Sequence, residues 1–163
     1  VRSALVLGLA RAAGLGGMVG GQMLDLAAEG RYGAAPLSEA DIRRLQVMKT
    51  GALLAFSAEA GAVLAGADAE TRAQLLAFGR ALGAAFQIAD DLLDREASAE
   101  ALGKRTGKDA GKGKATLVAV LGVAGARAEC DRLVAEAVQA LEGFGAKAEV
   151  LRQAARFAAA RRA

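Results

Sequence analysis

Residues 78–94 read F-G-R-A-L-G-A-A-F-Q-I-A-D-D-L-L-D, and this stretch indicates the fold class most directly. Apolar residues recur every three or four positions, and alanine, the strongest helix former, is frequent among them. The stretch therefore predicts a helix that faces a core. Asp68 precedes it as a candidate N-cap. We expect this helix to run from Asp68 to about Arg95.

The same helical pattern extends outward to both ends of the chain. No stretch alternates apolar and polar residues with the β-branched enrichment of a strand. Ser38-Glu39-Ala40-Asp41 is a capping-box pattern that begins a long helix ending near Leu64, with a kink predicted near Gly51. The other predicted helices cover 1–13, a stretch ending at Glu29, 115–122, 126–142 and 147–160, and 96–113 is a predicted loop. The sequence thus predicts an all-α fold.

The composition fits one compact domain with closely packed helices. The chain has 163 residues, of which 54% are hydrophobic but only 4% aromatic. A core made mainly of alanine, leucine and valine buries little area per residue, so its helices must approach closely.

Charge and residue usage exclude several classes of function. The net charge of +3 is small and aromatics are scarce, so we predict no nucleic-acid partner. The single cysteine, Cys130, excludes an intramolecular disulfide and fits a reducing, cytoplasmic compartment. The absence of histidine excludes histidine-based triads and the usual zinc sites. Apolar stretches such as 51–67 are short and interrupted by Ser57 and Glu59, so we predict no membrane span.

Three carboxylates at the end of residues 78–94 suggest a metal site. Asp90 and Asp94 are one helical turn apart and share a face with Gln87, whereas Asp91 lies about 100° round. Carboxylates this close repel one another unless a cation compensates, and hard oxygen ligands suit Mg²⁺. The alternative is a solvated acidic turn at the helix C-terminus, which the macrodipole disfavours.

Basic residues interleaved with glycines follow ten positions later. Acidic metal ligands beside a basic loop would suit a polyanion bridged by Mg²⁺, such as a diphosphate. A solvated lysine loop is the alternative interpretation. The basic residues are Lys104, Arg105, Lys108, Lys112 and Lys114.

Two further polar pairs lie earlier in the chain. Lys49 and Thr50 precede Gly51 and would present two donors to a phosphate, although a lysine lying along the surface is the alternative. Gln22 and Asp25 are three residues apart in an apolar helix, where they form either a packing hydrogen bond or a ligand contact.

Taken in order, four segments resemble the later motifs of the trans-isoprenyl diphosphate synthases. The resemblance covers nearly the whole chain and is greatest to short-chain bacterial synthases. It implies a helical bundle of the isoprenoid synthase type around a deep cavity, in a homodimer. The segments are G-M-V-G-G-Q-M-L-D-L (17–26), K-T-G-A-L-L (49–54), residues 78–94, and G-K-R-T-G-K-D-A-G-K-G-K-A-T-L (103–117).

The resemblance also implies a reaction. A Mg²⁺-dependent prenyltransferase condenses isopentenyl diphosphate with an allylic diphosphate, dimethylallyl or geranyl, to give farnesyl diphosphate. A geranylgeranyl diphosphate synthase is an alternative. Electrostatic stabilisation of the leaving group in a water-poor cavity would drive this chemistry, which needs no histidine.

Site roles follow by motif from the same resemblance. Asp90, Asp91 and Asp94 would form the second aspartate-rich motif and hold Mg²⁺, with Asp90 as a direct ligand. Lys49 and Lys104 would bind the allylic diphosphate. The other implied substrate contacts are Thr50 and Gln87 at the reacting carbons, Phe86 at the isopentenyl site, Lys114 over the diphosphates, and Gln22 and Asp25 in the cavity wall.

One departure from the family pattern is large. The first aspartate-rich motif and the arginine pair that follows it are missing from these residues. We therefore expect residues 1–163 to be the carboxy-terminal portion of a single synthase domain that does not catalyse condensation alone. A non-catalytic, synthase-like partner subunit is the alternative.

Overall fold

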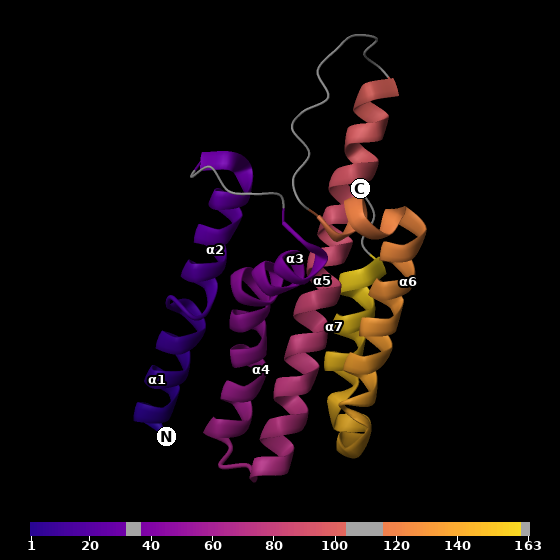
Figure 1. Ribbon diagram of the computed structural model, residues 1–163. Coiled ribbons are helices and arrows are strands. Elements are labelled where there is room, and N and C mark those ends of the chain that lie inside the picture. Colours follow the sequence, from indigo (N-terminus) through magenta and orange to yellow (C-terminus); the bar gives the residue numbers. More distant parts are fainter. Residues whose placement is uncertain (32–36, 104–115, 161–163) are drawn as a thin grey trace.

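The structure is a computed structural model that describes residues 1–31, 37–103 and 116–160 (Figure 1). Every regular element in these three ranges is a helix, which confirms the predicted all-α fold. The α-helices are α1 (Arg2–Ala13), α2 (Met18–Leu26), α3 (Glu39–Gln46), α4 (Ala52–Leu64), α5 (Ala69–Gly103), α6 (Leu117–Gln139) and α7 (Glu149–Ala160). The π-helical segments η1 (Ala27–Arg31) and η2 (Val47–Gly51) and the 3₁₀ segment η3 (Glu142–Ala148) complete the set.

Local signals in the sequence set several helix boundaries. Ser38 caps α3 by accepting a hydrogen bond from the Asp41 backbone N–H at 3.2 Å, and the Asp41 carboxylate accepts from the Ser38 N–H at 3.1 Å. Asp68 accepts from the Thr71 backbone N–H at 2.7 Å at the start of α5. The kink expected near Gly51 is present as the π-helical segment η2.

Helix α5 is longer than the sequence predicts. Residues 96–103, expected to begin a loop, continue the helix to Gly103. They contain no proline, and their alanines and glutamates favour a helix, so polarity alone does not end it. Asp94 therefore lies well before the last turn. The prediction that the aspartates lie at the helix C-terminus, where the macrodipole would disfavour them, was wrong.

The region after residue 116 also differs from prediction. The helices expected over 115–122 and 126–142 form one element, α6, that is broken at Gly122. Gly122 has φ 70° and ψ 167°, a conformation that glycine adopts without a steric penalty. The chain therefore changes direction there without a connecting loop.

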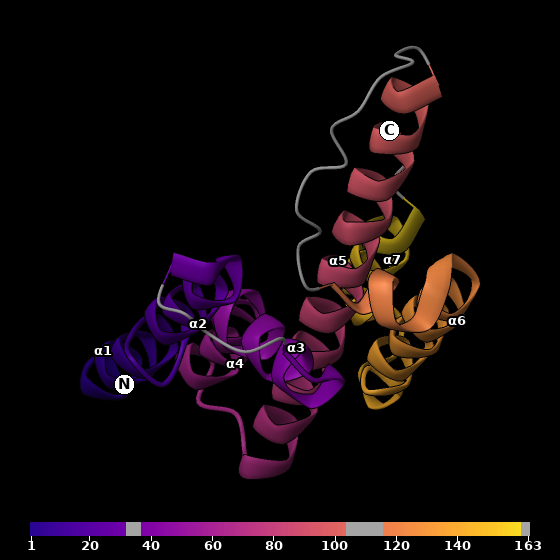
Figure 2. The same ribbon diagram turned by 45° about the horizontal axis from the view of Figure 1, so that its top comes forward.

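Helix α5 is the centre of the bundle. It packs against α4 on one side and against α6 and α7 on the other. Figure 2 shows α6 and α7 on the side of α5 away from α1 and α2. The larger core cluster contains residues of α3, α5 and α6, and the second joins α5 to α6, η3 and α7. In contrast, α1 has no buried residue.

Glycines allow the close approach that the composition predicts. A Cβ atom on Gly79 would lie 2.6 Å from the Cα of Ala55, and one on Gly83 would lie 2.8 Å from the Cα of Gly51. Real Cβ atoms do not approach backbone this closely, so only glycine fits. Helix α5 therefore contacts α4 and η2 almost backbone to backbone.

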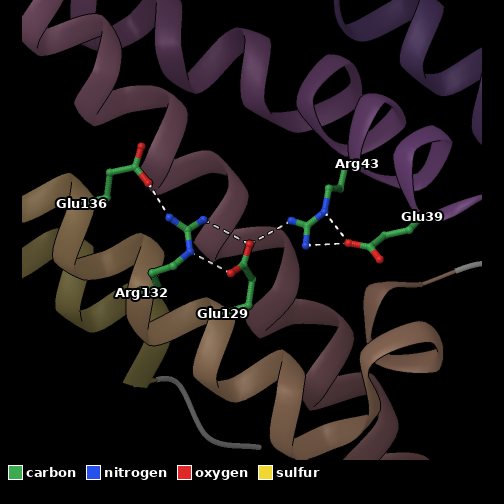
Figure 3. Close-up of polar contacts among 5 residues, drawn as sticks. All are labelled: Glu39, Arg43, Glu129, Arg132 and Glu136. Carbon is green, nitrogen blue, oxygen red and sulfur yellow. Dashed lines mark hydrogen bonds and ion pairs between the residues drawn. The ribbon is translucent and has the colours of Figure 1, made fainter.

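A network of charged side chains joins α3 to α6 (Figure 3). Glu129, whose side chain is 17% exposed, accepts hydrogen bonds from Arg43 at 2.9 Å and from Arg132 at 2.8 and 3.1 Å. Arg43 also pairs with Glu39, and Arg132 with Glu136. The hydrogen bond to Arg132 is the main cause that lowers the pKa of Glu129.

Replacing Glu129 by Ala is expected to lower the free energy of unfolding by about 1.5 kcal/mol, because it removes three hydrogen bonds to charged groups. Urea denaturation measures this change. Glu136→Ala is the matched control: Glu136 is 55% exposed and pairs with the same Arg132, so the expected change is below about 0.5 kcal/mol. Equal effects of the two variants would contradict this account.

Two apolar helical stretches remain largely unburied. Within the described residues, Arg2–Glu29 and Glu39–Leu64 are long and apolar enough to cross a membrane by length and composition. Core helices of soluble bundles can have the same length and composition. Both stretches carry polar side chains, such as Asp25 and Lys49, that contact each other.

Candidate active site at the π-helical turn

The π-helical segment η2 directs two neighbouring side chains to different helices. The Lys49 ammonium forms an ion pair with the Asp25 carboxylate of α2. Thr50, the next residue, donates a hydrogen bond from its hydroxyl to Oε1 of Gln87 on α5 at 3.0 Å. π-Helical turns of this kind are often found at functional sites. Residues separated by 24 and 37 positions are thereby joined at one turn.

A glycine holds α2 against this turn. Gly21 is buried, and a Cβ atom there would lie only 2.2 Å from the backbone nitrogen of Lys49. No side chain fits between the two backbones. The Gly-Gly pair that the sequence showed at 20–21 therefore determines how close Asp25 comes to Lys49.

A chain of hydrogen bonds continues from Thr50 into the aspartate cluster. Nε2 of Gln87 donates to Oδ1 of Asp91 at 3.2 Å. Nε2 of Gln46, at the end of α3, donates to Oδ2 of the same carboxylate at 2.8 Å. Asp91 is thus held on both oxygens by amides from two helices.

Asp91 has a strongly perturbed acidity. Burial raises its pKa from the ordinary value of 3.8 to about 6, and the charges of Asp90 and Asp94 add to this rise. The hydrogen bonds from Gln87 and Gln46 act in the opposite direction, because they favour the charged form. Clustered and desolvated carboxylates of this kind are typical of functional sites.

The raised pKa predicts a pH-dependent stability. Between pH 3.8 and about 6 the folded protein holds the Asp91 proton more tightly than the unfolded chain does, so this contribution to stability is lost as pH rises. In metal-free buffer, Asp91→Asn should therefore gain stability relative to the unmodified protein between pH 4 and pH 7. Urea midpoints across that range measure the difference. Parallel pH profiles would contradict the assignment.

Asp90 and Asp94 present the remaining carboxylates of the cluster. Both lie on α5, four residues apart and therefore on one face, with Asp90 half-buried and Asp94 exposed. No group of three or more acidic, histidine or cysteine side chains converges as a metal cage in the part of the chain that is described. An incomplete set of hard oxygen donors fits Mg²⁺, which keeps waters and is commonly shared with substrate phosphates.

A cavity of about 600 Å³ lies beside the turn. It begins at Val47, Met48 and Gly51 of η2 and extends between α1, α4 and α5. Its wall is mostly apolar, with charged side chains such as Arg11 and Arg80 among the lining residues. The polar contacts of η2 thus lie next to a space that a hydrocarbon chain can occupy.

The structure brings together most of the residues singled out in the sequence. Lys49 pairs with Asp25, its neighbour Thr50 is hydrogen-bonded through Gln87 to Asp91, and Asp90 and Asp94 lie on the same helix as Asp91. Phe86 and Gln22 are half-buried on α5 and α2, next to these residues along the chain. Lys104 and Lys114, the two basic-loop residues predicted to bind diphosphate, lie outside the described residues.

One residue of this contact chain was not singled out from the sequence. Gln46 is buried and contacts Asp91 directly. A signal was present, because Gln46 follows Ile42 by one turn and so interrupts the apolar stripe of α3 with an amide. A buried amide requires a partner, and that partner was not evident from local sequence.

The fold and the site together define a class: an all-helical bundle in which carboxylates, a lysine and an amide–hydroxyl pair meet beside an apolar cavity. The chain belongs to the polyprenyl synthetase family, whose model matches residues 7–156.

Individual relatives agree with this assignment. The chain is 38% identical over 160 residues to a farnesyl diphosphate synthase of Bacillus subtilis, covering 98% of this chain and 53% of the relative. It is 40% identical over 127 residues to the farnesyl diphosphate synthase of Geobacillus stearothermophilus, covering 78% and 41% respectively. The crystal structure of an FPP/GFPP synthase from Zymomonas mobilis superposes with a TM-score of 0.83 and 43% identity, over 96% of this chain and 50% of that one. The chain therefore spans about half the length of the relatives it matches.

Proposed function

We propose that the chain is the carboxy-terminal part of a trans-prenyltransferase that condenses isopentenyl diphosphate with an allylic diphosphate to give farnesyl diphosphate. The observation that carries this proposal is the π-helical turn. It directs Lys49 toward α2 and Thr50 toward Gln87, beside a helix with three clustered aspartates. A lysine ammonium, acceptor oxygens and carboxylates in one place suit a reaction in which a diphosphate leaves and positive charge develops on carbon.

In this proposal the leaving group is bound by charge. Lys49 exchanges its pairing with Asp25 for the oxygens of the allylic diphosphate, and Asp25 keeps the ammonium oriented until the substrate arrives. Asp90 and Asp94, with Asp91, are the residues that would hold Mg²⁺, Asp90 directly. A bound ion would supply positive charge that neutralises the leaving diphosphate.

The positive charge that develops on the allylic carbon needs acceptor oxygens. Thr50 and Gln87 present a hydroxyl and an amide oxygen that already contact each other at 3.0 Å. Oxygens fixed before the reaction stabilise such a charge without reorganising. The alkene carbon of isopentenyl diphosphate then forms the new carbon–carbon bond, and a proton is lost.

The apolar cavity supports a prenyl substrate in particular. Its space of about 600 Å³ begins at η2 and has a mostly apolar wall, so a hydrocarbon tail would pack along apolar side chains of α1, α4 and α5. Phe86, Gln22, Lys104 and Lys114 keep the substrate roles that the family resemblance implies. We also infer a soluble, cytoplasmic homodimer without a nucleic-acid partner, as the family resemblance, the single cysteine and the small net charge of +3 imply.

A product assay tests the proposed function. The complete protein that contains this chain is incubated with Mg²⁺, dimethylallyl diphosphate and isopentenyl diphosphate, and the prenyl alcohols are identified after phosphatase treatment. A fifteen-carbon alcohol is expected. A twenty-carbon alcohol would show that the product is geranylgeranyl diphosphate and not farnesyl diphosphate. No product from a folded protein that carries both aspartate-rich motifs would favour the non-catalytic partner subunit.

A further inference from the structure

Gln46 is the one buried polar or charged residue among the side chains that the structure describes. It is 7% exposed and shares the inner face of α3 with Ile42 and Leu45, which are 2% and 6% exposed. An amide in such a position costs several kcal/mol, roughly 2–7, unless it is hydrogen-bonded. The hydrogen-bond partner of its side chain is therefore informative about its role.

That partner belongs to the aspartate cluster. The Gln46 side chain donates to Oδ2 of Asp91 at 2.8 Å across 45 positions of sequence. The other oxygen of Asp91 accepts from Gln87 at 3.2 Å, and Gln87 in turn accepts from Thr50 at 3.0 Å. Four side chains from α3, η2 and α5 are thus connected, with Thr50 donating to Gln87 and both glutamines donating to Asp91.

The directions of these hydrogen bonds fix the orientation of the Gln87 amide. A carboxylate accepts only, so Asp91 takes the NH₂ group of Gln87 and leaves its carbonyl oxygen toward Thr50. If the Asp91 carboxylate rotated, Gln87 would lose the contact that distinguishes its oxygen from its nitrogen. Gln46 opposes that rotation because it holds the second oxygen of Asp91.

We propose that Gln46 is a positioning residue, which fixes the carboxylate of Asp91 so that Asp91 orients the amide oxygen of Gln87 toward Thr50 and the reacting carbon. This inference rests on the proposed function, since the oriented oxygen serves the developing positive charge of that reaction. Gln46 itself touches no substrate. It links the end of α3 to the residues that do.

Kinetics of the complete protein test the proposal. Gln46→Met keeps the length and shape of the side chain but removes the donor, and kcat is expected to fall about tenfold or more. The KM values for both diphosphates should stay within about twofold, because Lys49 is not contacted. Gln46→His supplies a ring N–H donor and should recover most of the turnover. Gln74→Met, at the other end of α5, is the matched control and should have no effect.

A second readout does not depend on activity. Selective ¹⁵N labelling of glutamine in the complete protein, to which this chain contributes six glutamines, gives side-chain signals that single substitutions assign. Gln46→Met should shift the NH₂ resonances of Gln87, and Gln74→Met should not. An unchanged Gln87 signal overturns the proposal.

The two readouts separate this inference from the proposed function. A shifted Gln87 signal with kcat within twofold of the unmodified enzyme overturns the positioning role and leaves the prenyltransferase intact. An unmodified protein without turnover overturns the proposed function, and the catalytic purpose of Gln46 with it. KM values that rise as much as kcat falls indicate a general loss of packing and also overturn the proposal.

Discussion

Replacing Asp90 by Ala in the complete protein is expected to lower turnover by about 10²- to 10³-fold, the cost of removing one group that stabilises transition-state charge. Asp90 is half-buried on α5, one turn before Asp94, and is the first candidate for a direct Mg²⁺ ligand. The fold should survive, because the substitution also removes a charge that raises the pKa of the neighbouring Asp91. Steady-state kinetics and circular dichroism of the purified variant measure the two effects separately.

Exposed Asp131 on α6 offers a matched control for this substitution. Asp131→Ala removes the same group far from η2 along the chain, and we expect unchanged turnover. An Asp90→Ala enzyme with normal kcat would contradict the assignment of Asp90 as a metal ligand. A variant that also fails to fold would show that Asp90 has a structural role instead.

Replacing Gly21 by Ala should have the largest effect on stability, a loss of about 3 kcal/mol. The added methyl group would lie 2.2 Å from the backbone nitrogen of Lys49 and 2.7 Å from its Cα. Backbone cannot rotate away as a flexible side chain does, so α2 must separate from η2. Urea denaturation measures the loss, and separation of α2 should also weaken the Asp25–Lys49 pair.

Gly61→Ala is the control for this prediction. Gly61 lies within α4, and a Cβ atom there would meet nothing within 4 Å. Alanine at a compatible helical position is expected to stabilise the protein by about 0.5–1 kcal/mol. The two glycine substitutions should therefore change stability in opposite directions. A destabilising Gly61→Ala would indicate that helix packing, rather than the contact at Lys49, explains both.

Local sequence predicted those parts of the fold that depend on local chemistry. The capping box at Ser38, the cap at Asp68 and the irregular helix near Gly51 were all evident from the sequence, because each depends on neighbouring residues. The extent of α5 was not, because residues 96–102 carry polar side chains without glycine or proline, and such a stretch is compatible with both helix and loop. Packing against α6, including the Glu96–Arg127 ion pair, favours the helix.

The site was predictable as a set of residues but not as a set of contacts. The motifs that carry Lys49, Gln87 and the aspartates were identified from the sequence. Their pairing was not, because it depends on how α2 and α5 approach η2 in three dimensions. Gln46 was overlooked for the same reason. Glutamine is usually exposed, and only its burial beside Asp91 reveals its contribution.

The unequal burial of the bundle has a consequence for its cooperativity. Both core clusters lie along α5 and α6, with further residues from α3, η3 and α7, whereas α1 contributes no buried residue. Regions with little buried apolar area open at lower free energy than the global transition. Lys49 and Asp25 thus lie on the side that opens at lower free energy. The cluster of Asp90, Asp91 and Asp94 lies on the side that opens at higher free energy. A ligand that bridges them would couple two units of different local stability, so occupancy of the site would also order the weaker unit.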